Sequence, residues 1–121
     1  MTIRQKKGKY GEDLAIKFLQ GKNYRIINRN FRSRFGEIDL IAYDKDVLVF
    51  IEVKYRTSDK FGTPLETIDK NKMLKIYKTI QYYLRDNQIQ TRFDVVSIYK
   101  DSKGKIQIEL IPNAYEFNDF N

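Results

Sequence analysis

The sequence predicts an α/β fold in which a mixed central sheet is flanked by helices, and three observations lead to this prediction. Residues 37–43 and 47–55 are short runs rich in Ile, Leu, Val and Phe on either side of the polar turn 44–46, which is typical of an antiparallel hairpin. Residues 10–20 and 69–87 carry apolar side chains at helical spacing. The order strand, helix, strand in the second half predicts a right-handed crossover to a parallel strand.

The expected elements follow one another without repeats. In chain order they are a helix over 10–20, strands over 24–34, 37–43 and 47–55, a loop over 56–66, a helix from 69 to about 87, a strand over 92–99 and an edge strand over 105–111. Gly21 marks the end of the first helix, and Asp69 is a suitable N-cap for the second. The first three strands should form an antiparallel meander, and the fourth should lie parallel to the third.

Length and residue types restrict both the organisation and the chemistry. The 121 residues predict a single domain, 1–121, whose polar and aromatic tail, 112–121, has no pattern that places it and is expected to be flexible. The chain contains neither cysteine nor histidine, which excludes disulfides, zinc sites built from these residues and an imidazole base. The remaining metal ligands are carboxylate and carbonyl oxygens, which suit Mg²⁺ or Mn²⁺.

The charge balance favours a polyanionic partner. Lys and Arg number 23 against 16 Asp and Glu, for a net charge of +7. We therefore expect a nucleic-acid partner, DNA before RNA, although composition alone fits a merely soluble basic protein equally well. The N-terminus lacks the apolar core of a signal peptide, and no apolar run is long enough to span a bilayer, so no membrane partner and a cytoplasmic location are expected.

Acidic residues and a lysine interrupt the two apolar strands of the predicted hairpin. If the hairpin loop consists of residues 45–46 alone, counting outward places Asp39 opposite Glu52 and Glu37 opposite Lys54. A loop one residue longer would separate Asp39 from Glu52 across the sheet. Charged groups in a buried strand are costly unless a cation or hydrogen bonds compensate them. The pattern therefore predicts a site at the end of the sheet.

The residue types at this site suggest a division of roles. Asp39 and Glu52 would give hard oxygen ligands to Mg²⁺ or Mn²⁺, together with the backbone carbonyl of Val53. The metal would lower the pKa of a bound water and offset charge on a phosphate. Lys54 would stabilise the developing negative charge or orient the attacking water. A structural ion pair between Glu52 and Lys54 is the alternative.

Glu12 is the fourth candidate, as a catalytic acid and metal ligand. Its neighbours three, four and seven residues on in the helix are apolar, so it lies at the margin of the buried face. Asp13 is expected instead to form a solvated ion pair with Lys17.

Four basic residues are candidates for contact with nucleic-acid phosphates. They are Arg32, Arg34, Arg56 and Lys72. Arg32 and Arg34 are expected to share a strand face, and Lys72 lies in the first turn of the second helix, near the site. Contacts of this kind make binding salt-dependent, with little sequence preference.

The chain resembles the bacterial YraN family of small endonuclease-like proteins. The matching segments are Gly11-Glu12, Asn30-Phe31-Arg32, Gly36 to Ala42, Phe50 to Arg56, Phe61-Gly62, Lys72 and Arg92 to Val96. The resemblance implies a restriction-endonuclease-like core similar to that of archaeal Holliday-junction resolvases. It also implies an active site at Glu12, Asp39, Glu52 and Lys54, and a possible homodimer. Glu37 and Arg56 match family positions whose roles are less obvious.

Two functions follow as hypotheses. The first is a Mg²⁺-dependent endodeoxyribonuclease that hydrolyses phosphodiester bonds in structured or branched DNA. The second is a non-catalytic nucleic-acid-binding module that retains an inactive site. A protein-interaction domain has only the nine tyrosines in its favour.

Overall fold

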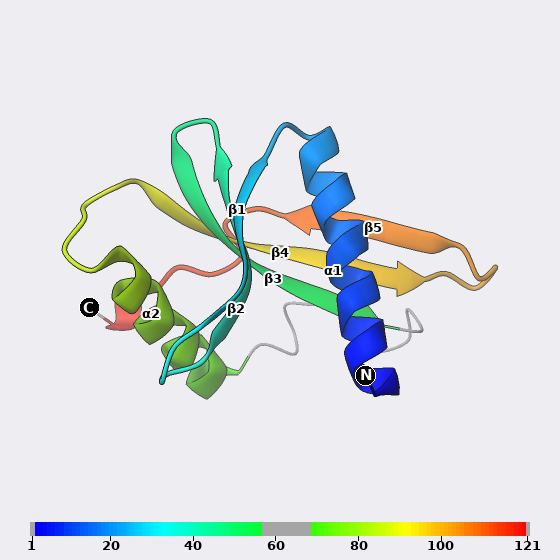
Figure 1. Ribbon diagram of the computed structural model, residues 1–121, viewed down its shortest axis with the longest axis horizontal. Coiled ribbons are helices and arrows are strands. Elements are labelled where there is room, and N and C mark those ends of the chain that lie inside the picture. Colours follow the sequence, from blue (N-terminus) through cyan, green and yellow to red (C-terminus); the bar gives the residue numbers. More distant parts are fainter. Residues whose placement is uncertain (1, 57–68, 121) are drawn as a thin grey trace.

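The computed structural model describes residues 2–56 and 69–120, which form one mixed sheet with a helix packed on each face (Figure 1). The elements are α1 (Ile3–Gly21), β1 (Arg25–Arg32), β2 (Glu37–Asp44), β3 (Val47–Arg56), α2 (Lys70–Leu84), β4 (Thr91–Lys100), β5 (Ile106–Ile111) and the short 3-10 helix η2 (Asn118–Phe120). The five strands lie in chain order, and only β3 and β4 run parallel. The predicted fold class is confirmed: a meander is followed by a helical crossover, consistent with a restriction-endonuclease-like core.

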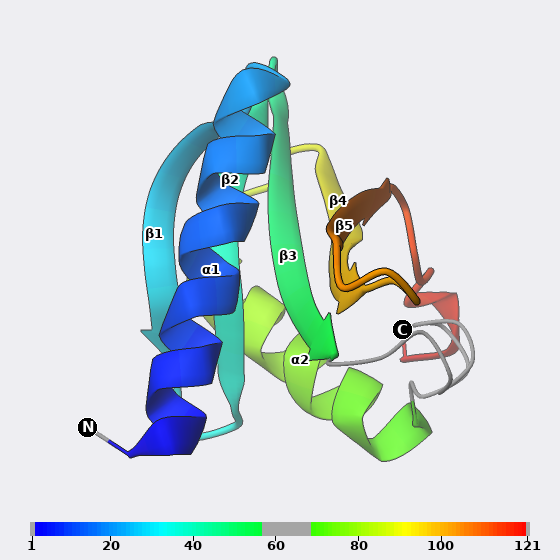
Figure 2. The ribbon, with the colours of Figure 1, turned by 90° about the vertical axis from the view of Figure 1, so that its right-hand side faces the viewer.

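Alternation along the strands builds two cores, one on each face of the sheet. On β3, Leu48 and Phe50 pack toward α2, whereas Val49 and Ile51 pack toward α1. The apolar residues that α2 buries are Met73, Ile76, Ile80 and Leu84. Figure 2 shows α1 on the near side of β1, β2 and β3, with α2 on the other side. The central strands are therefore covered on both faces, which explains their continuous apolar runs.

The helix bounds differ from those expected at two points. Helix α1 begins at Ile3, seven residues earlier than expected, because residues 3–9 are mostly polar and give no apolar period that would reveal a helix. Helix α2 is capped as predicted, since the Asp69 side chain accepts a hydrogen bond from the Lys72 N–H at 2.7 Å. It ends at Leu84, before the expected residue 87, because Arg85 adopts a left-handed φ of 55°.

The hairpin register is the prediction on which the site depends, and it is confirmed. Asp44 pairs with Val47, so the loop consists of residues 45–46, and the rungs continue to Leu40 opposite Ile51. The next position along places Asp39 beside Glu52.

The turn between β1 and β2 corrects one expectation. Strand β1 ends at Arg32, and the backbones of Ser33 and Gly36 exchange hydrogen bonds across the turn. The Ser33 hydroxyl also accepts a hydrogen bond from the Phe35 N–H, which is a local alternative to strand pairing. Arg34 therefore lies in the turn and does not share a strand face with Arg32.

Residues 112–120, which the sequence leaves unplaced, pack against the sheet and α2. The Ala114 N–H donates to the Phe93 carbonyl at 2.7 Å, and the rings of Phe117 and Phe120 lie 5.7 and 5.6 Å from that of Tyr77. The aromatic side chains bury apolar area without any regular spacing, so no periodicity could reveal their position. Except for Arg56 at the end of β3, the expected loop over 56–66 lies outside the described residues.

Neither α1 nor α2 combines the length and the apolarity that a bilayer-crossing helix needs.

A buried polar network joins four distant parts of the chain. The carboxylate of Asp94, fully buried on β4, accepts hydrogen bonds from Arg92 at 2.8 Å, from the Tyr24 hydroxyl at 3.0 Å and from the Asn113 N–H at 2.9 Å. Arg92 also donates to Asp44 at 3.0 Å. The hydrogen bond with Asp94 raises the pKa of Arg92, and burial followed by the charge of Asp94 raises the pKa of Tyr24 to about 12. The network holds the tail and the hairpin against β4.

Replacing Arg92 should be far more harmful than replacing another cation on the same strand. Arg92→Met leaves Asp94 buried without a counter-charge, and we expect the free energy of unfolding to fall by about 3 kcal/mol. Lys100→Met removes the same charge from an exposed position of β4 and should change stability by less than about 0.5 kcal/mol. Urea denaturation at pH 7 measures both values. Similar losses in the two variants would contradict a structural role for the network.

Candidate active site

The candidate site forms where β2 stops pairing with β3. The last recorded rung joins Leu40 to Ile51. One residue further along, the Asp39 carboxylate accepts a hydrogen bond from the Val53 N–H at 2.8 Å. A side chain therefore bonds to the β3 backbone just beyond the last rung. This fixes the carboxylate of Asp39 at the edge of the parting strands.

Glu52, on β3, meets a lysine from α2. Its Oε1 lies 2.8 Å from Nζ of Lys72, and the side chain of Glu52 is only 14 % exposed. Lys54, two residues along β3, lies next to Lys72. Asp39, Glu52 and Lys72 line a shared cleft of about 310 Å³ that also reaches Lys75. The structure thus brings together Asp39, Glu52, Lys54 and Lys72, all of which the sequence singled out.

Three ionisable groups at the candidate site have pKa values shifted from their ordinary values. Burial, and next the charge of Glu52, raise the pKa of Asp39 to about 8, although the Val53 N–H acts in the opposite direction. Burial, and next the neighbouring Lys72, lower the pKa of Lys54. Burial, the largest single cause, would lower the pKa of Lys72 as well, but the hydrogen bond to Glu52 and the charge of Glu52, together with smaller contributions from Lys54 and Asp39, raise this pKa overall. Perturbed groups gathered beside a cleft are a physical sign of a functional site.

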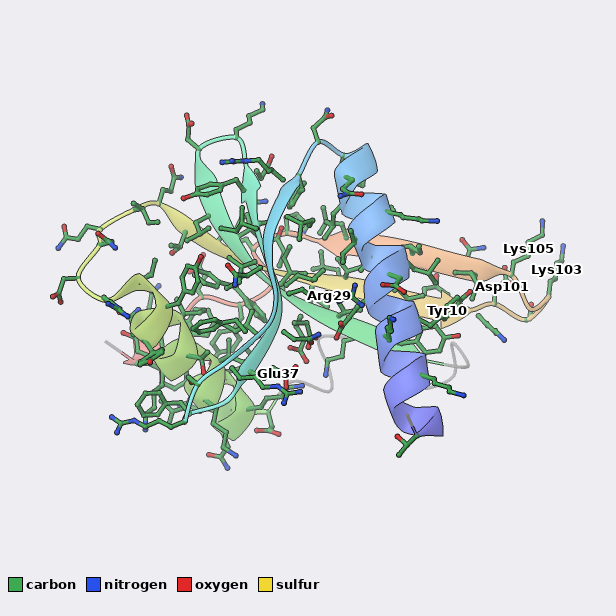
Figure 3. The ribbon with its side chains drawn as sticks, viewed as in Figure 1. Tyr10, Arg29, Glu37, Asp101, Lys103 and Lys105 are labelled. Atoms are coloured by element: carbon green, nitrogen blue, oxygen red, sulfur yellow. The ribbon has the colours of Figure 1, made fainter. Side chains whose placement is uncertain are left out.

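Glu12 lies beside this group but is held by other partners. Its Oε1 accepts hydrogen bonds from Arg29 Nε and Asn30 Nδ2, both at 3.1 Å, and its side chain is 14 % exposed. Figure 3 shows Arg29 in the space between β1 and α1. The charge of Glu12 adds to the rise in the Asp39 pKa, after burial and Glu52. Glu12 therefore acts on the site electrostatically while tying α1 to β1.

Arg29 is a residue that the sequence reasoning missed. Its Nη1 lies 2.8 Å from Asp13, so the pairing expected between Asp13 and Lys17 is replaced by one with β1. Its neighbour Asn30, which also bonds to Glu12, offered a sequence signal because it belongs to a matching motif. Nothing in the spacing along α1 could reveal a partner on a strand.

Ser97 is a second missed residue. It is fully buried on β4, on the rung that joins β4 to Lys54. Its hydroxyl has no hydrogen-bond partner among the residues that the structure describes. Ser97 lies on the same face of β4 as Val95, which packs toward α2. Its unsatisfied hydroxyl is therefore placed beside Lys54.

The donor set can be compared with what a divalent cation needs. Within residues 2–56 and 69–120, no three acidic side chains are grouped so as to hold a metal ion, and Glu12 stays apart on Arg29 and Asn30. Asp39 and Glu52 nevertheless place two hard oxygen donors at one cleft, and a cation, the ammonium of Lys72, already lies on Glu52. Two carboxylates and a backbone carbonyl such as that of Val53 are ligands that fit Mg²⁺ or Mn²⁺.

The other predicted basic residues lie outside the group. Arg32 is 76 % exposed and lies 3.4 Å from Glu37, so Glu37 faces β1 and not Lys54. The guanidinium of Arg34 covers the ring of Phe35, and that of Arg56 lies over Tyr99. A second cleft of about 460 Å³ contains Arg32 and Glu37. Its other lining residues are Gly8, Lys9, Glu12, Arg29 and Asn30. Because Glu37 borders both clefts, they adjoin at the start of β2.

Residues 101–103, Asp-Ser-Lys, have a spacing of acid and lysine like that of Glu52 and Lys54, but their role is structural. Asp101 accepts hydrogen bonds from the backbone N–H groups of Lys103 and Lys105 in the β4–β5 turn. These bonds, with that from Lys105 the largest cause, lower the pKa of Asp101, which is the reverse of the shift at Asp39. In Figure 3 this turn lies at the far end of the molecule from Glu37.

The raised pKa of Asp39 predicts a dependence of stability on pH. With a folded pKa of about 8 and an unfolded value near 3.8, the folded protein binds an extra proton between these limits, so its stability falls as pH rises through them. Asp39→Asn keeps the acceptor for the Val53 N–H but cannot ionise. We expect its free energy of unfolding to equal that of the wild type near pH 4 and to exceed it by at least ~2 kcal/mol at pH 8.

The measurement is urea denaturation of both proteins from pH 4 to 9 in EDTA. Asp101→Asn is the control. Because the pKa of Asp101 is lowered, its contribution to stability rises with pH, and only at low pH, so this variant should not reproduce the pH dependence expected of Asp39→Asn. Parallel pH curves for Asp39→Asn and the wild type would contradict the shift.

Comparison with known proteins assigns the chain to a family. The model described as "Uncharacterised protein family UPF0102" matches residues 11–98, which contain Glu12, Asp39, Glu52, Lys54 and Lys72. Similar curated proteins, each named "UPF0102 protein", come from Persephonella marina (46 % identity over 93 % of this chain and 95 % of the relative), Caldicellulosiruptor bescii (44 %, over 95 % and 100 %) and Syntrophus aciditrophicus (43 %, over 96 % and 93 %). The chain therefore belongs to the UPF0102 family, which is the YraN family that its motifs indicated.

Proposed function

We propose that this protein is a divalent-metal-dependent endonuclease that hydrolyses phosphodiester bonds in structured or branched DNA. The observation that carries the proposal is the cleft between β2, β3 and α2, which is lined by Asp39, Glu52 and Lys72 and has Lys54 beside Lys72. Two carboxylates suit a hard cation, and two lysines suit a phosphate. The net charge of +7 supports a polyanionic substrate.

The residues divide the work of the proposed reaction. Asp39, Glu52 and the carbonyl of Val53 would hold Mg²⁺ or Mn²⁺, which supplies Lewis acidity and a positive charge. Lys54 lies two residues beyond Glu52 on β3, where its ammonium stabilises negative charge that develops on the phosphate or orients the attacking water. Burial and Lys72 lower the pKa of Lys54, which makes proton donation from it easier than from an exposed lysine.

The second cleft supports a path for the substrate backbone. It adjoins the site at Glu37 and contains Lys9, Arg29 and Arg32. A DNA strand that crosses the start of β2 would place one phosphate at the site and neighbouring phosphates next to these cations. Such contacts position a nucleic acid without reading its bases. This favours recognition of DNA shape over sequence.

One observation favours the alternative, a nucleic-acid-binding module without catalysis. Lys72 already neutralises Glu52, and among the described side chains no third acid is placed so as to hold a metal ion together with Asp39 and Glu52. If that ion pair is permanent, a divalent cation is repelled from the Glu52 oxygen that Lys72 holds, and the domain would bind DNA without cutting it.

Cleavage of a panel of labelled DNAs tests the proposal. The panel contains single-stranded, duplex, flap and four-way-junction substrates, each with Mg²⁺, Mn²⁺ or EDTA. We expect metal-dependent cutting of a branched substrate, reduced about 100-fold or more by Asp39→Asn, Glu52→Gln or Lys54→Met, because each removes a group that acts on the reacting phosphate.

Glu109→Gln is the matched control for Glu52→Gln, since it removes the same charge from an exposed position of β5. Its rate should equal that of the wild type. Salt-sensitive binding without cutting in every lane would overturn the nuclease and leave the binding module. Cutting that survives all three site variants would remove the site from the mechanism.

A further inference from the structure

Lys72 occupies the position at which a divalent cation would contact Glu52. Its ammonium lies 2.8 Å from Glu52 Oε1, next to Lys54 and within electrostatic reach of Asp39. The ammonium covers one approach to this carboxylate oxygen, and its positive charge repels a second cation there. A metal that binds Glu52 from this side must therefore move the ammonium of Lys72 away.

The fold holds the base of Lys72 in place and leaves its tip adjustable. The residue lies in the first turn of α2, where its N–H bonds to the Asp69 side chain, and the following Met73 and Ile76 are buried in the core. Its side chain remains 41 % exposed. The backbone is thus fixed at the edge of the cleft, while four single bonds let the ammonium swing without any change in α2.

We propose that Lys72 is a resident counter-cation, which a divalent metal displaces from Glu52 and which then binds a substrate phosphate. This inference rests on the proposed function and adds an order of events to it. Without metal, the ion pair compensates the buried carboxylate of Glu52. With metal, the released ammonium lies at the cleft shared with Asp39 and becomes available to the polyanion. Metal and DNA therefore bind cooperatively through one side chain.

Metal affinity gives the first test, independent of any cleavage. Titration calorimetry with Mn²⁺ compares the wild type with Lys72→Met, Lys72→Arg and Lys75→Met. Lys72→Met removes the competing cation, and we expect its Kd for Mn²⁺ to be about tenfold lower than that of the wild type, the equivalent of one charge-assisted hydrogen bond. Lys72→Arg keeps the charge and should bind Mn²⁺ as the wild type does.

Lys75→Met is the matched control. Lys75 lines the same cleft from the same helix but is exposed, and no ion pair from it is recorded within the described ranges. Its loss should change the Kd for Mn²⁺ by less than about twofold. If Lys72→Met and Lys75→Met bind Mn²⁺ equally more tightly than the wild type, the loss of any positive charge near the cleft explains the result. That outcome would overturn the specific role of Lys72.

The salt dependence of DNA binding gives the second test. The slope of log K against log salt for a duplex is measured in EDTA and in Ca²⁺, a hard cation with the same preference for oxygen ligands. In EDTA, Lys72 is bound to Glu52, so Lys72→Met should leave the slope unchanged. In Ca²⁺ the released lysine contacts a phosphate, and the variant's slope should be shallower by about 0.9.

The outcomes separate this inference from the function on which it rests. Tighter Mn²⁺ binding by Lys72→Met together with a metal-dependent change of slope supports the displacement. If the wild type binds Mn²⁺ and Lys72→Met binds it equally well or more weakly, the displacement is overturned, while the nuclease proposal survives. Failure of the wild type and every variant to bind Mn²⁺ would overturn both.

Discussion

The hydrogen bond from the Val53 N–H to the Asp39 carboxylate is the constraint on which the site depends. It lies just beyond the last rung between β2 and β3, so the strands part while a side chain still holds them in register. The parted strands give Glu52 and Lys54 room to meet α2. A regular rung at this point would have used the same N–H and left Asp39 without a fixed position. The sheet thus supports the site at the point where its own pairing ends.

Two aspartates in this domain, Asp94 fully buried and Asp39 partly buried, have opposite environments. Asp94 accepts hydrogen bonds from an arginine, a tyrosine and a backbone N–H, so its charge is well compensated. Asp39 accepts one recorded hydrogen bond and lies near Glu52, Glu12 and Glu37, which adds like charge to burial. Under the proposed function, Asp39 has this costly environment because it binds the metal. The contrast with Asp94 supports that proposal independently of the acidic motif.

The sequence was sufficient for those parts of the fold that depend on local periodicity. The Asp69 cap followed from a side chain that bonds to a nearby N–H, and the parallel β3–β4 pair from the handedness of crossovers. The hairpin register was one of two alternatives, and the structure has the one with the two-residue loop. Contacts between distant segments had no such signal. Arg29 meets Glu12 across 17 residues, and the aromatic tail packs on α2 without any period. The pairing of Lys72 with Glu52 was equally hidden, because an α2 lysine could as well have pointed to solvent.

The network around Asp94 also has a consequence for how the chain folds. Its hydrogen bonds join residues separated by 70, 68, 48 and 19 positions, and they connect the start of β1, the hairpin, β4 and the segment after β5. Contacts of such long range form only after large loops have closed, which makes them late events. In kinetic terms we expect the network to form after the folding nucleus. Interactions absent from the nucleus slow unfolding more than they speed folding, so the network should lengthen the lifetime of the folded sheet.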